Sequence, residues 1–192
     1  SIHWLLAAAL SLNNSYKKIL EIGTYNGEFS NLLSKLFPES KIITIDLPDS
    51  DPILKSYYNR DDNATYLKFV NDQKNNTSNK NIISIKKNTF FLLNELNLNE
   101  KFDFIWVDGG HLYPDIAWDL CNAYFLLRKG GILMCDDIVL SRIHYNNGYV
   151  STDSRDVLKY IEERIGRSAT YLLKKLNPDL YPKKKTRKYV SV

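Results

Sequence analysis

Three acidic side chains and a histidine follow two apolar segments of the sequence and could carry out metal-assisted acid–base chemistry. Asp108 and His111 belong to one Asp-Gly-Gly-His tract, and Asp136 and Asp137 form an acidic pair further along the chain. Carboxylates that gather at one cleft repel one another, and a bound hard cation relieves that repulsion. Ligation by oxygen favours Mg²⁺, with Ca²⁺ or Mn²⁺ as substitutes. The pattern therefore predicts a metal site, with His111 near enough in sequence to accept a proton.

A second group of residues has the composition of a nucleoside-binding turn. The loop 21–27 reads Glu-Ile-Gly-Thr-Tyr-Asn-Gly, in which Gly23 permits a tight turn and a close approach of the backbone. The helix that begins near Gly27 offers free N–H groups to a polar ligand. A dinucleotide site needs a third glycine, so this loop suits a nucleoside without phosphates better than NAD. Asp46, after the next apolar run, is suited to accept hydrogen bonds from a ribose diol.

The hydrophobic pattern predicts the sheet that would bring these residues together. Short apolar runs typical of buried strands alternate with amphipathic helical stretches. The predicted strands are 18–22, 41–45, 82–86, 103–107 and 131–135. The first two strands and the helix between them form a βαβ unit, which implies parallel strands. Ligands of such sheets bind beyond the carboxyl ends of the strands, where all the candidate residues stand.

We therefore predict one α/β domain over residues 1–192, a doubly wound, Rossmann-like and mostly parallel sheet with helices on both faces. Two β-like runs near the end of the chain raise the expected number of strands to seven, with the last one antiparallel. The accessory segments are a short helix at 2–12, an Asn-rich excursion at 47–81 with a helix inside it, and a basic segment at 183–188.

Composition and charge restrict the possible classes of function. The 192 residues are 44% hydrophobic and 25% charged, which is typical of one globular domain. The longest apolar stretch, 4–12, is shorter than the ~20 residues of a membrane span and lacks the features of a signal peptide. Cys121 and Cys135 form no disulfide framework, so a cytoplasmic location is expected. The net charge of +4 comes mostly from the basic segment, so composition alone does not indicate nucleic acid.

Taken together, these motifs resemble class I S-adenosylmethionine-dependent methyltransferases. The resemblance covers residues 18–137 and rests on the glycine loop, on Asp46, on the Val-Asp-Gly-Gly-His tract that ends at His111, and on the Leu-Arg-Lys-Gly-Gly turn at 127–131. The tract 102–137 is especially similar to the branch that contains the macrolide-sugar and cephalosporin-pathway O-methyltransferases. In that branch, acids at these positions hold a divalent metal that orients the substrate hydroxyl.

The resemblance implies methyl transfer from S-adenosylmethionine to an oxygen of a small hydroxylated acceptor, assisted by Mg²⁺. The implied catalytic residues are Asp108 and His111, with His111 as the base. The implied metal ligands are Asp108, Asp136 and Asp137. The implied cofactor-binding residues are Glu21, Gly23, Thr24, Tyr25, Gly27, Asp46, Asn88, Thr89 and Asp108. Neither nucleic acid nor a membrane is an expected partner, and assembly into a homo-oligomer stays open.

Two other functions stay open at this point. The chain could be a metal-independent RNA methyltransferase that uses the basic segment 183–188, and salt-sensitive RNA binding would favour that function. It could also be a nucleoside-binding module without catalysis, in which His111→Ala behaves as the wild type. His111 could instead cap the following helix or bind substrate, and Asp46 could cap a turn. His3 and His144 have no constellation of candidate catalytic or metal-binding residues around them in the sequence and are predicted to be surface or packing residues.

Overall fold

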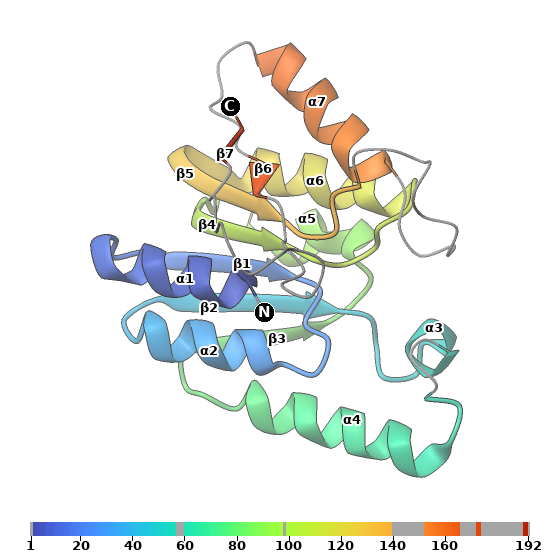
Figure 1. Cartoon of the computed structure of the whole chain (residues 1–192). Helices are drawn as coiled ribbons and strands as arrows, with labels where there is room; N and C mark the ends of the chain where they lie inside the picture. Colours follow the sequence, from blue (N-terminus) through green and yellow to red (C-terminus); the bar gives the residue numbers. More distant parts are fainter. Residues whose placement is uncertain are drawn as a thin grey trace, which may run out of the picture.

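The computed structural model describes residues 2–56, 60–97, 99–139, 152–165, 172–173 and 190–191. Its centre is a sheet of five strands in the order β3-β2-β1-β4-β5, with every neighbouring pair parallel (Figure 1). The strands are β1 (Lys18–Ile22), β2 (Lys41–Asp46), β3 (Ile82–Lys86), β4 (Phe102–Val107) and β5 (Leu127–Cys135). The strand order reverses between β1 and β4, which is where a doubly wound sheet binds its ligand. The predicted parallel α/β fold is therefore confirmed.

Helices cover both faces of this sheet. The helices α1 (Ile2–Asn13) and α2 (Glu28–Leu36) pack on one face, and α6 (Asp115–Leu126) and α7 (Asp153–Ile165) lie over the other (Figure 1). Successive side chains of β4 point to opposite faces of the sheet, so they pack into the hydrophobic cores on the two faces in turn. Phe104 and Trp106 pack with α1 and α2, whereas Ile105 and Val107 pack with α6. The continuous apolar run that predicts a buried strand reflects this burial on two sides.

The Asn-rich excursion contains two helices, and it packs against the domain. Its helices are α3 (Pro52–Ser56) and α4 (Asn63–Asn76), of which α4 is longer than the stretch expected and α3 was not expected. Asn76 donates from Nδ2 to the carbonyl oxygen of Asn26 at 2.8 Å. Asn81 donates in the same way to the carbonyl oxygen of Ser40 at 3.2 Å. The asparagines thus supply hydrogen bonds to backbone groups that the loops leave unpaired.

Two further boundaries differ from the prediction. The helix expected at 90–98 is shorter, and consists of the 3₁₀ turn η2 (Thr89–Phe91) followed by α5 (Leu92–Glu95). Strand β5 begins before the glycine pair that predicted a turn. Gly130 has a φ of 76°, and the pairing with β4 shifts register between Phe102 and Phe104, so the chain passes the glycines without leaving the sheet.

The seven-stranded sheet expected from the sequence is not formed by the described residues. The short strands β6 (Leu172–Leu173) and β7 (Val190–Ser191) pair antiparallel with each other, in a separate two-stranded sheet. Their backbone groups bond to one another and do not extend the central sheet. The basic segment 183–188 and His144 lie outside the described residues. None of the helices in the described part of the chain is long and apolar enough to cross a membrane.

Candidate functional site

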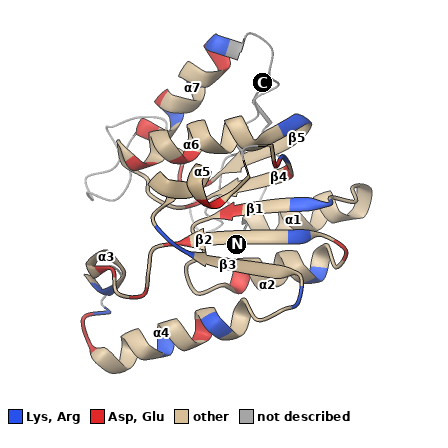
Figure 2. Ribbon diagram, turned by 180° about the vertical axis from the view of Figure 1, so that it is seen from behind, with Lys and Arg blue, Asp and Glu red and all other residues tan. Residues whose placement is uncertain are grey.

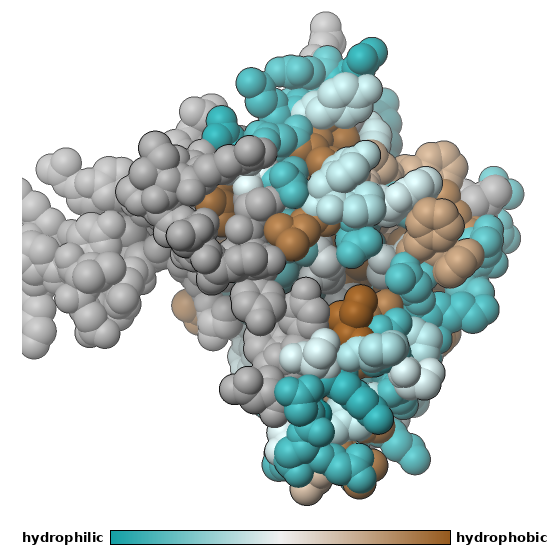
Figure 3. All heavy atoms as spheres, turned by 90° about the vertical axis from the view of Figure 1, so that its right-hand side faces the viewer, coloured by the Kyte–Doolittle hydropathy of each residue, from teal (hydrophilic) through white to brown (hydrophobic). Residues whose placement is uncertain are grey.

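Strands β1 and β2 are basic at their amino ends and acidic towards their carboxyl ends (Figure 2). Strand β1 begins with Lys18 and carries Glu21 near its end, and β2 begins with Lys41 and ends with Asp46. Seen from the carboxyl edge, the described surface is mainly hydrophilic, with small hydrophobic patches (Figure 3). The edge that the fold offers to a ligand therefore carries the candidate acidic residues.

The glycine loop adopts a backbone that requires its two glycines. Gly23 and Gly27 have φ values of 94° and 77°, in the left-handed region that glycine adopts without strain. Gly23 also lies directly against the end of β4. A Cβ atom on Gly23 would lie 2.1 Å from the carbonyl oxygen of Asp108 and 2.8 Å from the nitrogen of Gly109. The loop predicted to bind the cofactor is thus packed on the loop predicted to do the chemistry.

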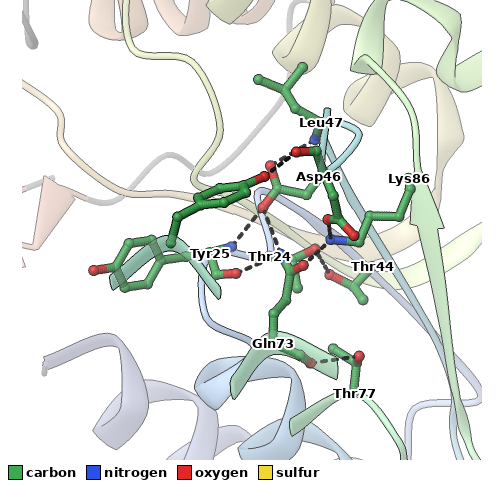
Figure 4. A network of polar contacts seen from close by, with 10 residues as sticks. Thr24, Tyr25, Thr44, Asp46, Leu47, Gln73, Thr77 and Lys86 are labelled. Carbon is green, nitrogen blue, oxygen red and sulfur yellow. Dashed lines mark hydrogen bonds and ion pairs between the residues drawn. The ribbon is translucent and has the colours of Figure 1, made fainter. Parts of the chain in front are cut away.

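Asp46 joins the glycine loop to the end of β2 (Figure 4). Its Oδ2 accepts hydrogen bonds from the backbone N–H of Tyr25 at 2.8 Å and from Gln73 Nε2 at 3.3 Å. Its Oδ1 accepts from the N–H of Leu47 at 2.8 Å. Burial raises the pKa of the Asp46 carboxyl, and these backbone hydrogen bonds and the charge of Lys86 act in the opposite direction. The carboxylate is therefore fixed in place beside the loop, as a ribose-binding acid must be.

Gln73 is a member of this network that the sequence reasoning missed. It donates from Nε2 to the carbonyl oxygen of Tyr25 at 2.6 Å, and its Oε1 contacts Lys86 Nζ (Figure 4). Lys86 also pairs with Asp49, at 2.7 Å. Gln73 lies on the buried face of α4 with Tyr66, about two helical turns after it. The helix predicted from the sequence was too short to include Gln73, so its helical periodicity did not reveal it.

Glu21 lies beneath the loop, where it is 1% exposed. The Ser30 hydroxyl donates to its Oε2, and Thr44 also forms a hydrogen bond with the side chain. Burial raises the pKa of Glu21 to about 8, and the hydrogen bonds from Ser30 and Thr44 oppose this rise. Thr24 is likewise buried, with its Oγ1 2.6 Å from Thr44 Oγ1. Both side chains therefore support the loop from below, although they were predicted among the residues that line the cofactor site.

Asn88 and Thr89 stand at the end of β3, as predicted. Asn88 caps η2, since its Oδ1 accepts from the N–H of Phe90 at 2.8 Å. A cavity of about 540 Å³ opens beside it, between the loops that follow β2 and β3. Thr89 lies near Asp119 of α6, a carboxyl whose pKa burial raises to about 7. The end of β3 is thus linked through α6 to the back of the Asp108 loop.

Asp108, His111 and Asp137 come together at the ends of β4 and β5. One ligand atom from each lies within 4.8 Å of the others. His111 Nε2 is 3.8 Å from Asp108 Oδ1 and 3.6 Å from Asp137 Oδ2. Two of the three predicted metal ligands are therefore joined by the predicted base, in a group that is open enough for a ligand to reach.

Asp136, the remaining predicted ligand, faces a different partner. Its Oδ2 lies 3.2 Å from Nδ1 of His3, and its Oδ1 accepts a hydrogen bond from the N–H of Asp137 at 2.8 Å. His3 is therefore not the surface or simple packing residue expected from the sequence. The sequence gives no sign of this contact, because His3 lies 133 positions before Asp136. Only the packing of α1 on the sheet brings the two residues together.

A family model described as a methyltransferase domain matches residues 20–138. This stretch begins in β1 and ends just past the acidic pair, so it contains every residue of the predicted site. The chain belongs to this methyltransferase family. The resemblance to class I methyltransferases seen in the sequence is thereby confirmed. A comparison with curated protein sequences found no match.

Solved methyltransferase structures share the fold of this methyltransferase domain. The O-methyltransferase TomG from Streptomyces achromogenes, in complex with SAM, aligns with a TM-score of 0.58 at 22% identity, over 89% of this chain and 72% of that one. An O-methyltransferase from Bacillus cereus, in complex with SAH, aligns with a TM-score of 0.55 at 17% identity, over 90% and 72%. SAH-bound PaMTH1 from Podospora anserina aligns with a TM-score of 0.57 at 16% identity, over 90% and 73%. Each similarity establishes the common fold.

A second cavity in the methyltransferase domain lies between two helices. It measures about 390 Å³ and is formed between α6 and α7, with Tyr113, Cys121 and Tyr160 in its lining. Neither this cavity nor the one beside Asn88 includes the Asp108–His111–Asp137 group. The chemistry of the candidate site is therefore assigned from its side chains and their distances.

Proposed function

We propose that this methyltransferase domain transfers a methyl group from S-adenosylmethionine to an oxygen of a small hydroxylated acceptor, with the assistance of a divalent metal. The observation that carries the proposal is the group Asp108, His111 and Asp137, which lies at the same sheet edge as the glycine loop. The structures of TomG with SAM and of the Bacillus cereus O-methyltransferase with SAH have the same fold. Their names support both the cofactor and the choice of oxygen as the methyl acceptor.

The glycine loop and Asp46 would hold the cofactor. The absence of side chains at Gly23 and Gly27 lets the loop pack closely on the end of β4 and on α4, where a Cβ atom at either position would clash. Asp46 has each carboxyl oxygen oriented by a backbone N–H and can accept a hydroxyl in addition. Tyr25 is half exposed and lies beside the loop, and Asn88 marks the next strand end along the edge.

The side chains at the ends of β4 and β5 suit a divalent cation. The carboxylates of Asp108 and Asp137 are oxygen donors of the kind that Mg²⁺ or Mn²⁺ prefers, and each offers an oxygen within 4.8 Å of the other and of the His111 ring. When bound, such a cation lowers the pKa of a coordinated hydroxyl group and orients it. Asp108 and Asp137 would hold the cation, and Asp136 stands directly beside them.

His111 would act as the general base. Its Nε2 lies 3.8 Å from Oδ1 of Asp108 and 3.6 Å from Oδ2 of Asp137, so it is close to a hydroxyl group held at these carboxylates. In the reaction the acceptor oxygen attacks the methyl carbon in line, the bond from that carbon to the sulfur of S-adenosylmethionine breaks, S-adenosylhomocysteine leaves, and the hydroxyl proton passes to His111. Positioning and proton removal are therefore the main tasks of the protein.

The proposal is tested by methyl transfer from S-adenosylmethionine labelled in its methyl group. The purified chain is offered a panel of small catechols, phenols and sugars, each with and without Mg²⁺, and RNA in a separate arm. We expect labelled product from a small hydroxylated acceptor, and a higher rate with Mg²⁺. Label in RNA, or a rate that does not depend on Mg²⁺ after treatment with a chelator, contradicts the proposal.

A further inference from the structure

The first helix places a histidine at the edge of the sheet that carries the candidate site. His3 lies in the first turn of α1, and its side chain is 15% exposed. Its ring packs on Trp106 at the end of β4 with centroids 4.9 Å apart, and meets the ring of Phe29 edge-on at the same centroid distance. These two aromatic contacts leave the imidazole little freedom to turn. The ring nitrogen Nδ1 is therefore held at a fixed position, 3.2 Å from Oδ2 of Asp136.

Asp136 in turn forms a hydrogen bond with its neighbour in the chain, Asp137. While Oδ2 faces His3, the other oxygen, Oδ1, accepts a hydrogen bond from the backbone N–H of Asp137 at 2.8 Å. Asp137 has a φ of 51°, in the left-handed region that residues other than glycine enter at a cost of about 1 kcal/mol. The hydrogen bond from its N–H to Asp136 supports that conformation. In this conformation Asp137 Oδ2 lies 3.6 Å from His111 Nε2.

We infer that His3 is a positioning residue for the cation-binding group, and that it acts through Asp136. His3 orients the Asp136 carboxylate, Asp136 holds the backbone of Asp137, and Asp137 presents its own carboxylate to Asp108 and His111. The inference rests on the proposed function, because it concerns the affinity of that group for a divalent cation. It also makes α1 a component of the site, since the helix supplies the first residue of the chain of contacts.

Two substitutions at His3 separate the polar contact from the packing contact. His3→Phe keeps an aromatic ring against Trp106 and Phe29 but removes the nitrogen that faces Asp136. His3→Asn removes the ring but retains an amide nitrogen at the position of Nδ1. Mn²⁺ affinity is measured for each by titration calorimetry and by the electron paramagnetic resonance signal of free Mn²⁺, with S-adenosylhomocysteine affinity and melting temperature measured on the same samples.

Loss of a residue that orients a metal ligand typically costs 10-fold to 100-fold in metal affinity, so we expect His3→Phe to bind Mn²⁺ at least about tenfold more weakly than the wild type. His3→Asn should recover most of that affinity even if its melting temperature is lower. Binding of S-adenosylhomocysteine should not change in either variant. Wild-type Mn²⁺ affinity in His3→Phe, or a loss in His3→Asn equal to that in His3→Phe, overturns the inference.

A double-mutant cycle tests whether His3 acts through Asp136. In an Asp136→Asn background, His3→Phe should cause no further loss of Mn²⁺ affinity, because the residue that it orients is already changed. If the losses of Mn²⁺ affinity caused by the two substitutions add in the double variant, His3 does not act through Asp136. The proposed function is judged separately by the wild type. If the wild type does not bind Mn²⁺, the metal-assisted function is contradicted together with this inference, whereas normal wild-type binding with no effect of His3→Phe contradicts the inference alone.

Discussion

Gly23 and Asp108 are in direct backbone contact, which joins the loop after β1 to the loop after β4. A Cβ atom on Gly23 would lie 2.1 Å from the carbonyl oxygen of Asp108, far inside any tolerated distance. The two loops are therefore packed backbone against backbone, and the N–H of Asp108 also donates to the carbonyl oxygen of Ile22 at 2.8 Å. Through this contact the candidate cofactor loop fixes the position from which Asp108 presents its carboxylate to the candidate metal site.

Gly23→Ala should consequently disrupt both the candidate cofactor loop and the position of Asp108 at the candidate metal site. We expect a lower melting temperature and no measurable binding of S-adenosylhomocysteine, because the backbone of Asp108 has to shift to admit the methyl group. Gly130→Ala is the matched control: Gly130 also has a positive φ, of 76°, but an added Cβ there would meet nothing within 4 Å. The control should lose only the ~1 kcal/mol of the unfavourable φ and bind normally. Equal effects at the two positions contradict the importance of the close contact.

Glu21 should make the stability of the domain fall as the pH rises. Its pKa is about 8 in the folded protein and near 4.5 in the unfolded chain, so between these values the folded state holds a proton that the unfolded state has released. The free energy of unfolding should therefore decrease from about pH 5 to pH 8, with a contribution from this group on the order of 1 kcal/mol per pH unit. The Asp119 carboxyl, with a pKa of about 7, acts in the same direction.

Glu21→Gln isolates this contribution, because the amide keeps the shape of the side chain and does not ionise. Urea denaturation at several pH values should show a shallower decrease for the variant than for the wild type. The two proteins should differ most at pH 8 and least near pH 5. If the free energy of unfolding changes with pH in the same way in both proteins, Glu21 is ionised in the folded protein at neutral pH, which contradicts the prediction.

His111→Gln should separate binding from catalysis. Loss of a general base typically lowers the rate by 10²-fold to 10⁴-fold, and we expect kcat for methyl transfer to fall within about that range. Binding of S-adenosylhomocysteine should be unchanged, since His111 belongs to the group at the ends of β4 and β5 and not to the glycine loop. Stopped assays with labelled S-adenosylmethionine measure the rate, and calorimetry measures the binding. An unchanged kcat would assign His111 to substrate contact or to capping.

Removal of divalent metal should lower methyl transfer without preventing cofactor binding. A chelator should reduce the rate, added Mg²⁺ should restore it, and Asp137→Asn should reduce the restored rate because one carboxylate of the group is lost. Asp72→Asn is a suitable control, since Asp72 pairs on α4 with Lys68, four residues before it. A rate for Asp137→Asn equal to that of the control contradicts the assignment of Asp137 to the metal site.

The sequence predicts the sheet well because each central strand is buried on both faces. Such strands appear as short continuous apolar runs, and the run 18–22 coincides with β1. The same burial makes the carboxyl ends of the strands predictable, and with them Asp46, Asp108 and Asp137. Element ends with special backbone geometry are less predictable: Gly130 signals a turn by its type, yet its positive φ lets β5 continue through it.

The contacts that orient the candidate residues could not be predicted from the sequence. Gln73 reaches Tyr25 and Asp46 from a helix in the Asn-rich excursion, and His3 reaches Asp136 from the first helix. Neither residue has a motif around it, since each acts through long-range packing. Glu21 differs, because it belongs to the glycine-loop motif and was therefore predicted to bind the cofactor. Its burial beneath the loop could not be predicted from that motif.

The most direct test of the account is calorimetric titration of the wild type and of Asp46→Ala with S-adenosylhomocysteine. Asp62→Ala serves as the control, because Asp62 caps α4 and its loss should cost about 1 kcal/mol of stability without touching the site. The account predicts saturable binding by the wild type and by Asp62→Ala, and its loss in Asp46→Ala. No binding by the folded wild type would contradict the methyltransferase function proposed here, and undiminished binding by Asp46→Ala would contradict the cofactor site.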